Sequence, residues 1–166
     1  MRIQKNSLLS MMVIAVVFTL LGAGLTIWLG WPKYQLAKAS AAWPTTTGRI
    51  VTSRVDDARD SKGKRSYSAS VNFTYNVLNH EYLSDQIWAG GGYSSSSKPA
   101  HEQVVSRYPV GSEVPVYYDP QKPQQGILVP GVTWMNYVLL GIGGVFFFTG
   151  LLFGVGSVFV ILRRIL

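Results

Sequence analysis

The chain has 166 residues, a net charge of +7 and no cysteine. This length accommodates one modest domain and two membrane spans, but it excludes two full-sized enzymatic domains. The lack of cysteine excludes a disulfide framework, a thiol nucleophile and a thiolate metal site.

The charged residues are placed unevenly along the chain. All eight acidic residues lie between Asp56 and Asp119, and eleven of the fifteen basic residues lie between Lys33 and Lys122. The other four basic residues lie at the chain ends, each pair beside a long uncharged stretch: Arg2, Lys5, Arg163 and Arg164. This distribution is typical of a membrane protein and argues against the nucleic-acid partner that the net charge alone would suggest.

The first uncharged stretch runs from residue 6 to residue 32 and exceeds the roughly 20 apolar residues that cross a hydrocarbon core. We predict a cytoplasmic tail at residues 1–7 and a transmembrane helix at residues 8–31, followed by a short amphipathic linker. A cleaved signal peptide is the alternative, because AKA at residues 37–39 resembles a cleavage site, but the apolar run is long for a signal peptide.

Two strands are predicted after the linker. TTTGRIVTSRV at residues 45–55 is rich in β-branched side chains, and YSASVNFTYNV at residues 67–77 alternates apolar and polar side chains. Both patterns favour β-strands, and the alternation indicates a half-buried one. The charged stretch DDARDSKGKRS at residues 56–66 is predicted to be a solvated connection.

A third strand is predicted after a tight turn. Asn79 and His80 suit the two central positions of that turn, which would set Val77 opposite Tyr82. The glycine- and serine-rich stretch AGGGYSSSS at residues 89–97 is predicted to form a flexible loop.

A short helix and two further strands are predicted to follow. KPAHEQVVSRY at residues 98–108 has a proline suited to a first helical turn and apolar side chains at helical spacing. SEVPVYYD at residues 112–119 alternates, and Pro115 within it indicates an edge strand or a bulge. Residues 119–126 are predicted to turn, and ILVP at residues 127–130 to form a last short strand.

Together these elements predict a small β-domain at residues 43–131. Five strands and one short helix suit a partly closed β-barrel, either OB-like (the oligonucleotide-and-oligosaccharide-binding type) or SH3-like. A compact arrangement resembling a β-sandwich is the alternative. None of these folds specifies a function.

A second transmembrane helix is predicted at residues 134–162, with a cytoplasmic tail at residues 163–166. Because basic residues flank the outer ends of both helices, we expect both termini to face the cytoplasm. Aromatic residues suited to the opposite interface lie at the inner ends: Trp28, Trp31, Tyr34, Trp134 and Tyr137. The chain is therefore predicted to be a multi-pass protein of the cell (inner) membrane that contacts the lipid bilayer and holds its β-domain outside the cytoplasm.

Small residues recur at helical spacing in the two predicted spans: Ala15, Thr19 and Ala23 in the first, and Gly143, Gly150, Gly154 and Ser157 in the second. Such faces let helix backbones approach closely. They are predicted to pack the two spans together or to bind a helix of a second copy or of another membrane protein. Neither span carries an ionisable residue, which argues against an ion pathway through this chain.

The histidines of the chain do not form a catalytic or metal-binding pattern. The two His-Glu pairs, at His80 and His101, lack the second histidine of the zinc-protease spacing. We therefore predict no metal, no cofactor and no enzymatic activity, with His80 in a turn and His101 exposed on a helix. An envelope hydrolase that uses His80, Ser84 or Asp85 is a weaker alternative, because the sequence does not show which side chains meet in space.

Two features suggest ligand contacts. The basic cluster Lys62, Lys64 and Arg65 suits an anionic lipid headgroup or an acidic envelope polymer, and a loop that only aids solubility is the alternative. Tyr117 is a candidate for stacking on a sugar ring, with core packing as its alternative reading.

Three segments resemble a known family: W..TTGRI at residues 43–50, VNFTYNV...EY at residues 71–82 and YPVGSEVPVYYDPQKP...L.PG at residues 108–131. They are similar to the domain-of-unknown-function 3592 family of membrane proteins, and the third segment is the most specific. The turn at Asn79 and His80 departs from that family, in which it often contains glycine. The resemblance implies a membrane-anchored β-domain and no particular activity, catalytic residue or ligand.

The residues taken together favour a non-enzymatic, membrane-anchored interaction or scaffold module. A module that binds envelope polymer or lipid headgroups is the alternative.

Overall fold

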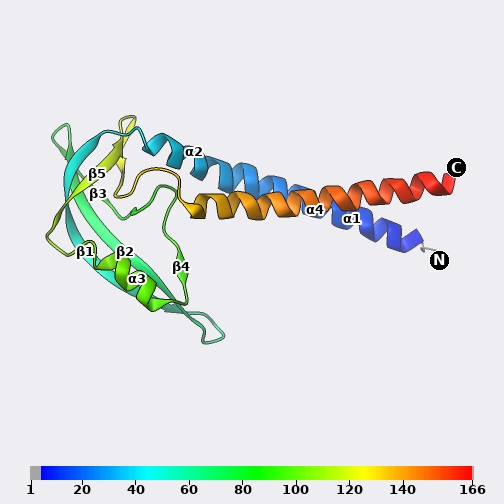
Figure 1. Cartoon of the computed structure of the whole chain (residues 1–166), viewed down its shortest axis with the longest axis horizontal. Coiled ribbons are helices and arrows are strands. Elements are labelled where there is room, and N and C mark those ends of the chain that lie inside the picture. The colour runs from blue at the N-terminus through cyan, green and yellow to red at the C-terminus, as the bar shows by residue number, and fades with distance from the viewer. Residues whose placement is uncertain (1–4, 166) are drawn as a thin grey trace. The chain divides into compact units, whose positions relative to one another are not determined.

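A computed structural model describes residues 5–165 of the chain, and these form two compact units. The helical unit comprises the described residues up to Gln35 and those from Trp134 onward. The sheet unit comprises Leu36–Thr133. Figure 1 shows the elements of both units along the chain.

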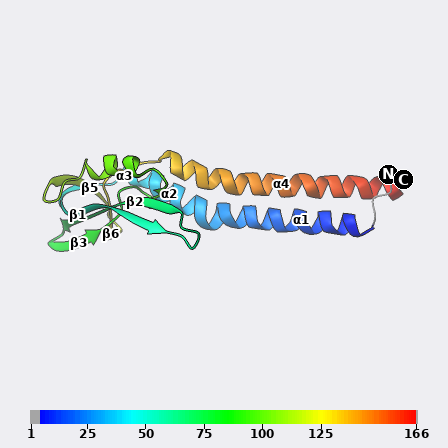
Figure 2. The ribbon, with the colours of Figure 1, turned by 90° about the horizontal axis from the view of Figure 1, so that it is seen from below.

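The helical unit contains two long helical segments that lie side by side (Figure 2). The first consists of α1 (Lys5–Gly24), the π-helix η1 (Leu25–Gly30) and the start of α2 (Trp31–Ser40), and the second is α4 (Trp134–Ile165). Helical structure therefore continues past residue 31 and takes in most of the predicted linker, up to Ser40.

The π-helix explains how Pro32 is tolerated within this helical run. A proline inside a helix removes one hydrogen bond and crowds the carbonyl group four residues earlier. In η1 the backbone hydrogen-bond pattern is already wider than that of an α-helix. The backbone N–H of Trp31 donates to the carbonyl of Thr26, five residues before it. The wider turn relieves this crowding just where Pro32 needs it.

Both long helical segments are long and apolar enough to span a membrane, over Leu9–Ser40 and Trp134–Arg163. Only 11% of the most apolar window of each is buried. A core helix of a soluble protein buries its apolar side chains, whereas here Trp28 is 80% exposed and Leu152 is 73% exposed. The basic residue Arg2, expected to flank the first helix, lies outside the described residues.

The sheet unit has six antiparallel strands and one short helix: β1 (Thr45–Arg59), β2 (Arg65–Val77), β3 (His80–Ser84), β4 (Ser94–Ser95), α3 (Lys98–Val105), β5 (Glu113–Asp119) and β6 (Lys122–Ile127). The main strand order is β3-β2-β1-β5-β6, and β4 pairs with β2. Helix α3 confirms that residues 98–108 contain a helix, and strand β5 confirms that residues 112–119 contain a strand.

The predicted five-stranded, partly closed barrel is wrong, because the sheet has six strands and is open. The chain leaves β3 at Ser84, before it can form a ladder along β6. Beyond Ser84, the segment that follows β3 and the segment that follows β6 are linked by one isolated parallel bridge, between Trp88 and Val129. Backbone hydrogen bonds from Leu128 to Gln86 and from Val129 to Ile87 accompany that bridge.

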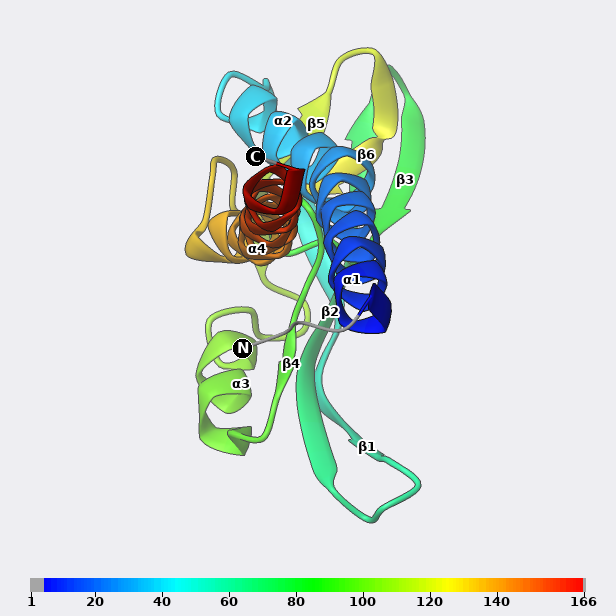
Figure 3. The ribbon, with the colours of Figure 1, turned by 90° about the vertical axis from the view of Figure 1, so that its right-hand side faces the viewer.

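The first hairpin is longer than predicted, as Figure 3 shows for β1 and β2. Pairing continues out to Arg59 and Arg65, so most of the stretch predicted as a solvated connection is strand. Backbone ladder bonds do not require apolar side chains, and the charged side chains simply stay exposed. The turn itself is held by Asp60, whose Oδ1 accepts hydrogen bonds from the backbone N–H groups of Lys62 and Lys64, both at 2.9 Å.

The turn between β2 and β3 lies one residue earlier than predicted. Leu78 and Asn79 occupy its centre with φ values of 52° and 64°, as a two-residue type I′ turn requires. Val77 therefore pairs with His80, and Tyr82 pairs with Tyr75. A tertiary contact supports this register, since the buried Ser84 hydroxyl at the end of β3 donates to the carbonyl of Gly126 at 2.7 Å.

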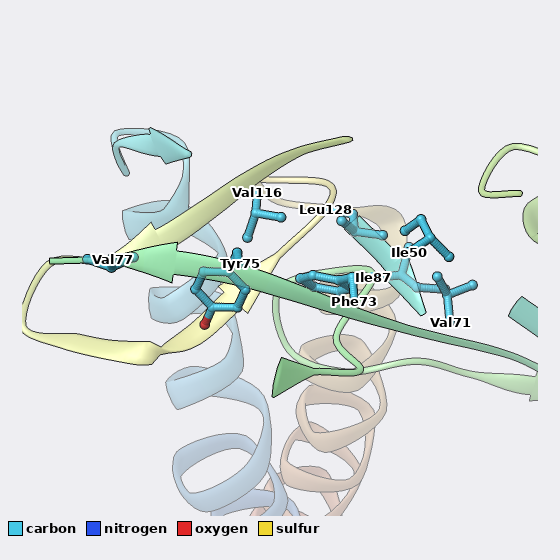
Figure 4. Close-up of a cluster of buried hydrophobic side chains, with 8 residues drawn as sticks. All are labelled: Ile50, Val71, Phe73, Tyr75, Val77, Ile87, Val116 and Leu128. Carbon is cyan, nitrogen blue, oxygen red and sulfur yellow. The ribbon is translucent and has the colours of Figure 1, made fainter. Parts of the chain in front are cut away.

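The main core lies on one face of this sheet (Figure 4). It consists of eight buried side chains: Ile50, Val71, Phe73, Tyr75, Val77, Ile87, Val116 and Leu128. The alternation predicted at residues 67–77 supplies half of them, because every second residue of a strand points to the same face.

The end of the sheet differs from the prediction. Strand β6 begins within the stretch predicted to turn and ends at Ile127, where the last strand was expected to begin. Pro115 lies in β5, which is an inner strand because β1 and β6 flank it. The pairs with β6 begin only at Tyr117, so Pro115 lies where β1 is the only strand paired with β5, and its missing N–H breaks no bond to β6.

Candidate functional site

The residues predicted to contact ligand do not form one site. Lys62, Lys64 and Arg65 are exposed at the tip of the β1–β2 hairpin. Tyr117 pairs with Thr45 at the opposite end of β1. It is half-buried and packs against the second, smaller core cluster of Ala37, Ala89 and Ile127.

A polar cleft of about 260 Å³ lies beside the hairpin tip. Four lining residues come from the hairpin, namely Asp60, Lys64, Arg65 and Ser66, and three come from residues 94–96. Strand β4 brings the two segments together, because Ser94 pairs with Ser68 and Ser95 pairs with Tyr67. The stretch predicted to be a flexible loop thus contains two residues held on the sheet.

Cations in this cleft lack anionic partners within the described part of the chain. The ion pairs found among residues 5–165 join Arg54 to Asp56 at 2.6 Å and Lys98 to Glu102 at 3.2 Å. Neither pair involves Lys64 or Arg65. The lining carboxylate of Asp60 is engaged by two backbone N–H groups of its own turn.

The prediction that His101 is an exposed helix residue is wrong. Its side chain is fully buried; its Nε2 lies 3.0 Å from the Ser95 hydroxyl and its ring centroid lies 5.0 Å from that of Tyr93. The sequence did carry a signal, because His101 precedes Val104, Val105 and Tyr108 by three, four and seven residues, the spacing of one helix face.

One ring nitrogen of His101 is unsatisfied. Nδ1 is buried and has no hydrogen-bond partner within residues 5–165. Ser95, by contrast, has a second partner, because its hydroxyl oxygen accepts a hydrogen bond from the backbone N–H of Ser97 at 3.2 Å. His101 and this N–H group together fix the Ser95 hydroxyl at the edge of the cleft.

The three residues considered for hydrolysis do not meet in one site: two are engaged in separate structural contacts and the third is exposed. Ser84 is buried and donates to Gly126, while its oxygen accepts from the backbone N–H of Gln86 at 3.2 Å. His80 is exposed, with Nδ1 at 3.1 Å from the carbonyl of Leu78. Asp85 is exposed. No cluster of three or more His, Asp or Glu side chains suited to a metal ion occurs within residues 5–165.

Within the helical unit, small residues form the contact between α1 and α4. Gly143, Gly150 and Ser157 are buried on α4, seven residues apart, and Ala15 is buried on α1. A Cβ atom added at Gly150 would overlap the backbone N–H of Thr19. The hydroxyls of Thr19 and Ser157 each bond the carbonyl four residues earlier, at 2.7 Å, so they are satisfied without water.

Two other predicted packing residues are placed differently, and one glycine was missed. Ala23 is only half-buried, whereas its neighbour Gly22 is buried; a Cβ atom there would lie 2.7 Å from the carbonyl oxygen of Gly143. The seven-residue spacing from Ala15 to Gly22 was the available signal. Gly154 faces Ala15 more loosely and helps to line an apolar groove of about 700 Å³ between the helices.

The architecture defines a class of protein: two helices able to span a membrane, with an antiparallel sheet domain inserted between them. Residues 46–133 match the family described as Domain of unknown function (DUF3592). The match covers more than half of the chain, so the protein belongs to this family, as the three sequence segments indicated. A search of curated proteins found no match.

Proposed function

We propose that the protein is a non-enzymatic interaction or scaffold module, anchored by two transmembrane helices, that presents its sheet domain outside the cytoplasm. One observation carries this proposal: the helices are paired through glycine, yet most of their apolar surface stays exposed in the single chain. Lipid and other transmembrane helices are the surroundings that would cover this apolar surface.

The proposed location is the cell (inner) membrane with both termini in the cytoplasm. Its support is the placement of basic residues at the outer ends of the two helices, which favours their retention on the cytoplasmic side. The proposed partners are a second copy of the chain or another membrane protein. The groove at Gly154 supports this, because small residues and an apolar lining admit a further helix.

The non-enzymatic part of the proposal is supported by the roles of Ser84 and His80. The Ser84 hydroxyl is buried and donates to a backbone carbonyl, and His80 contacts its own turn. An envelope hydrolase built on these residues would need both contacts to break. Activity that survives the double variant His80→Ala/Asp85→Ala would exclude that site.

The interaction proposal is tested by brief crosslinking in native membranes, followed by native mass spectrometry of the tagged full chain. We expect a reproducible partner or a defined homo-oligomer. A strictly monomeric, partner-free protein would contradict the proposal.

The orientation is tested by cysteine labelling, since the natural chain has no cysteine to interfere. In intact cells, a membrane-impermeant maleimide should label Ser61→Cys in the exposed hairpin turn. It should label Arg2→Cys only after the membrane is permeabilised. The reverse labelling pattern would refute the proposed topology.

A second candidate function is the binding of an acidic envelope polymer or a lipid headgroup. It is favoured by the exposed cations Lys62, Lys64 and Arg65 at the hairpin tip and by the cleft beside two of them.

A further inference from the structure

We propose that the cleft beside the β1–β2 hairpin tip binds a phosphate group carried on a hydroxylated backbone, such as a glycerol or sugar phosphate. This inference rests on the second candidate function above and assigns it a defined site and ligand chemistry. The cleft residues are Asp60, Lys64, Arg65, Ser66 and residues 94–96.

The cations of the cleft provide the affinity for phosphate. Lys64 and Arg65 form no ion pair within the described residues, so both charges are available to a ligand. Arginine binds phosphate through two parallel N–H groups, and lysine adds a mobile point charge. Lys62 belongs to the same turn but does not line the cleft, so it makes a matched internal control.

The serines of the cleft extend the site beyond simple charge attraction. The hydroxyls of Ser66, Ser94 and Ser96 have no hydrogen-bond partner within residues 5–165, and Ser95 is held in place by the buried His101. Hydroxyls can donate to phosphate oxygens and also accept from ligand hydroxyls.

The carboxylate of Asp60 decides between inorganic phosphate and a phosphate ester. Its Oδ1 is used by the turn, and its negative charge repels any phosphate group, whether bare or esterified. The same carboxylate can accept a hydrogen bond from a hydroxyl group of a polyol. The mixed lining of two cations, one carboxylate and four serines therefore suits a hydroxylated phosphate ester, and about 260 Å³ is room for one such small group.

The test uses the full chain in a maltoside detergent, which contains no phosphorus, with glycerol 3-phosphate as the probe. Line broadening in phosphorus NMR reports binding. We expect Lys64→Ala to weaken binding about tenfold, the size of one lost hydrogen bond to a charged group. Lys62→Ala, which removes the same charge from the same turn, should have little effect, and Ser94→Ala/Ser96→Ala should weaken binding with no change in charge.

Two further probes separate the sources of the phosphate. The phosphorus NMR line of inorganic phosphate should broaden less than that of glycerol 3-phosphate. Equal broadening of the two lines would overturn the role given to the ligand's hydroxyls. Dihexanoyl phosphatidylglycerol, kept below its micelle concentration, tests a lipid headgroup: tighter binding than glycerol 3-phosphate identifies a lipid as the source, and weaker binding identifies a water-soluble ester. Both of these results retain the site.

The control variants also distinguish binding in the cleft from diffuse attraction of an anion to the hairpin tip. If Lys62→Ala and Lys64→Ala weaken binding equally, the cleft is refuted while diffuse attraction to the hairpin tip survives. If the natural chain binds none of the probes, both the cleft and the lipid-headgroup form of the second candidate function fail. The interaction proposal is tested independently by crosslinking.

Discussion

At the scale of single residues, Tyr75 and Gly126 form the tightest point of the sheet domain. Tyr75 is a fully buried residue of β2, and its hydroxyl donates to the carbonyl of Pro123 at 2.7 Å. Its ring lies directly over Gly126 in β6, where an added Cβ atom would come within 2.5 Å of the ring carbon Cζ. Glycine at this position therefore allows β2 and β6 to approach across the core.

Replacing Gly126 by alanine should destabilise the sheet domain by about 1–3 kcal/mol, the usual cost of overpacking a core. The ring cannot move aside cheaply, because its hydroxyl is bonded and its faces are packed. Denaturant unfolding of the full chain in detergent, followed by aromatic circular dichroism, measures the loss. Gly92→Ala is the control, since nothing lies within 4 Å of a Cβ atom there; equal stability of the two variants would contradict the packing argument.

Burial of Tyr75 also makes the stability of the sheet domain depend on pH. Desolvation, with a smaller contribution from nearby Tyr82, raises the pKa of Tyr75 from 10.0 to about 12. Because the folded state holds this proton more tightly than the unfolded state, stability is retained below pH 10 and falls as pH rises from about 10 to about 12.

The expected loss over that interval is roughly 2 to 3 kcal/mol, from a shift of two pKa units. Tyr75→Phe should remove this part of the alkaline destabilisation, although it costs about 1 kcal/mol at neutral pH through the lost hydrogen bond to Pro123. Unfolding midpoints measured for both proteins across this pH range give the comparison. Parallel curves would show that Tyr75 does not titrate as a buried group.

At the scale of elements, the β2–β3 hairpin contains a local conflict between sequence and conformation. Leu78 adopts a positive φ of 52°, which costs an L-residue with a bulky side chain about 1–2 kcal/mol. Its side chain is 87% exposed and gains nothing from packing. The register of β3 is nevertheless kept, because Ser84 is tied to β6.

Leu78→Asn should therefore stabilise the sheet domain by about 0.5 to 1 kcal/mol, because asparagine tolerates the left-handed conformation. The denaturant midpoint of the full chain measures this gain. Leu83→Asn, an exposed position within β3, is the matched control and should be neutral or slightly destabilising. A lower midpoint for Leu78→Asn would mean that the turn does not adopt this conformation.

The contact between α1 and α4 makes a second prediction at this scale. The ideal Cβ position at Gly154 lies 3.8 Å from the Cβ of Ala15, close to the mean Cβ separation in disulfides. Ala15→Cys/Gly154→Cys should form a disulfide on mild oxidation.

The product is read by cutting the chain at a protease site inserted after Gly91, which is exposed. The two halves should stay joined on a non-reducing gel and separate after reduction. Ala15→Cys/Gly156→Cys is the control, because nothing lies within 4 Å of a Cβ atom at Gly156. Equal crosslinking of both pairs would contradict the assigned helix faces.

At the scale of the whole molecule, the two compact units have different sources of stability. The sheet unit has its own buried core, whereas the helical unit buries little apolar surface within the chain. In detergent the helices keep their backbone hydrogen bonds away from water, and urea acts mainly on the sheet domain.

We therefore expect unfolding in two steps. Urea should abolish the aromatic circular dichroism of the packed core while much of the far-ultraviolet helical signal remains. Gly126→Ala should shift only the first step, and a helix-interface variant such as Gly150→Leu should leave that step unchanged. A single coincident transition for both signals would contradict independent units.

The sequence alone determined the features that depend on composition and local periodicity. The two uncharged stretches predicted the long apolar helices, and the alternation at residues 67–77 predicted the side chains of β2 that fill the core. Three short segments indicated the family. These features could be predicted because each depends on neighbouring residues only.

Contacts between distant residues decided the rest. The bond from Ser84 to Gly126 supports the β3 register, and β3 ends too early for a barrel to close. The pairing of β4 with β2 brings three serines beside Lys64 and Arg65, and the packing of α3 buries His101 against Ser95. Such contacts produce no periodic pattern in the sequence, because they join residues that lie far apart along the chain. Only the tertiary structure could therefore reveal the cleft.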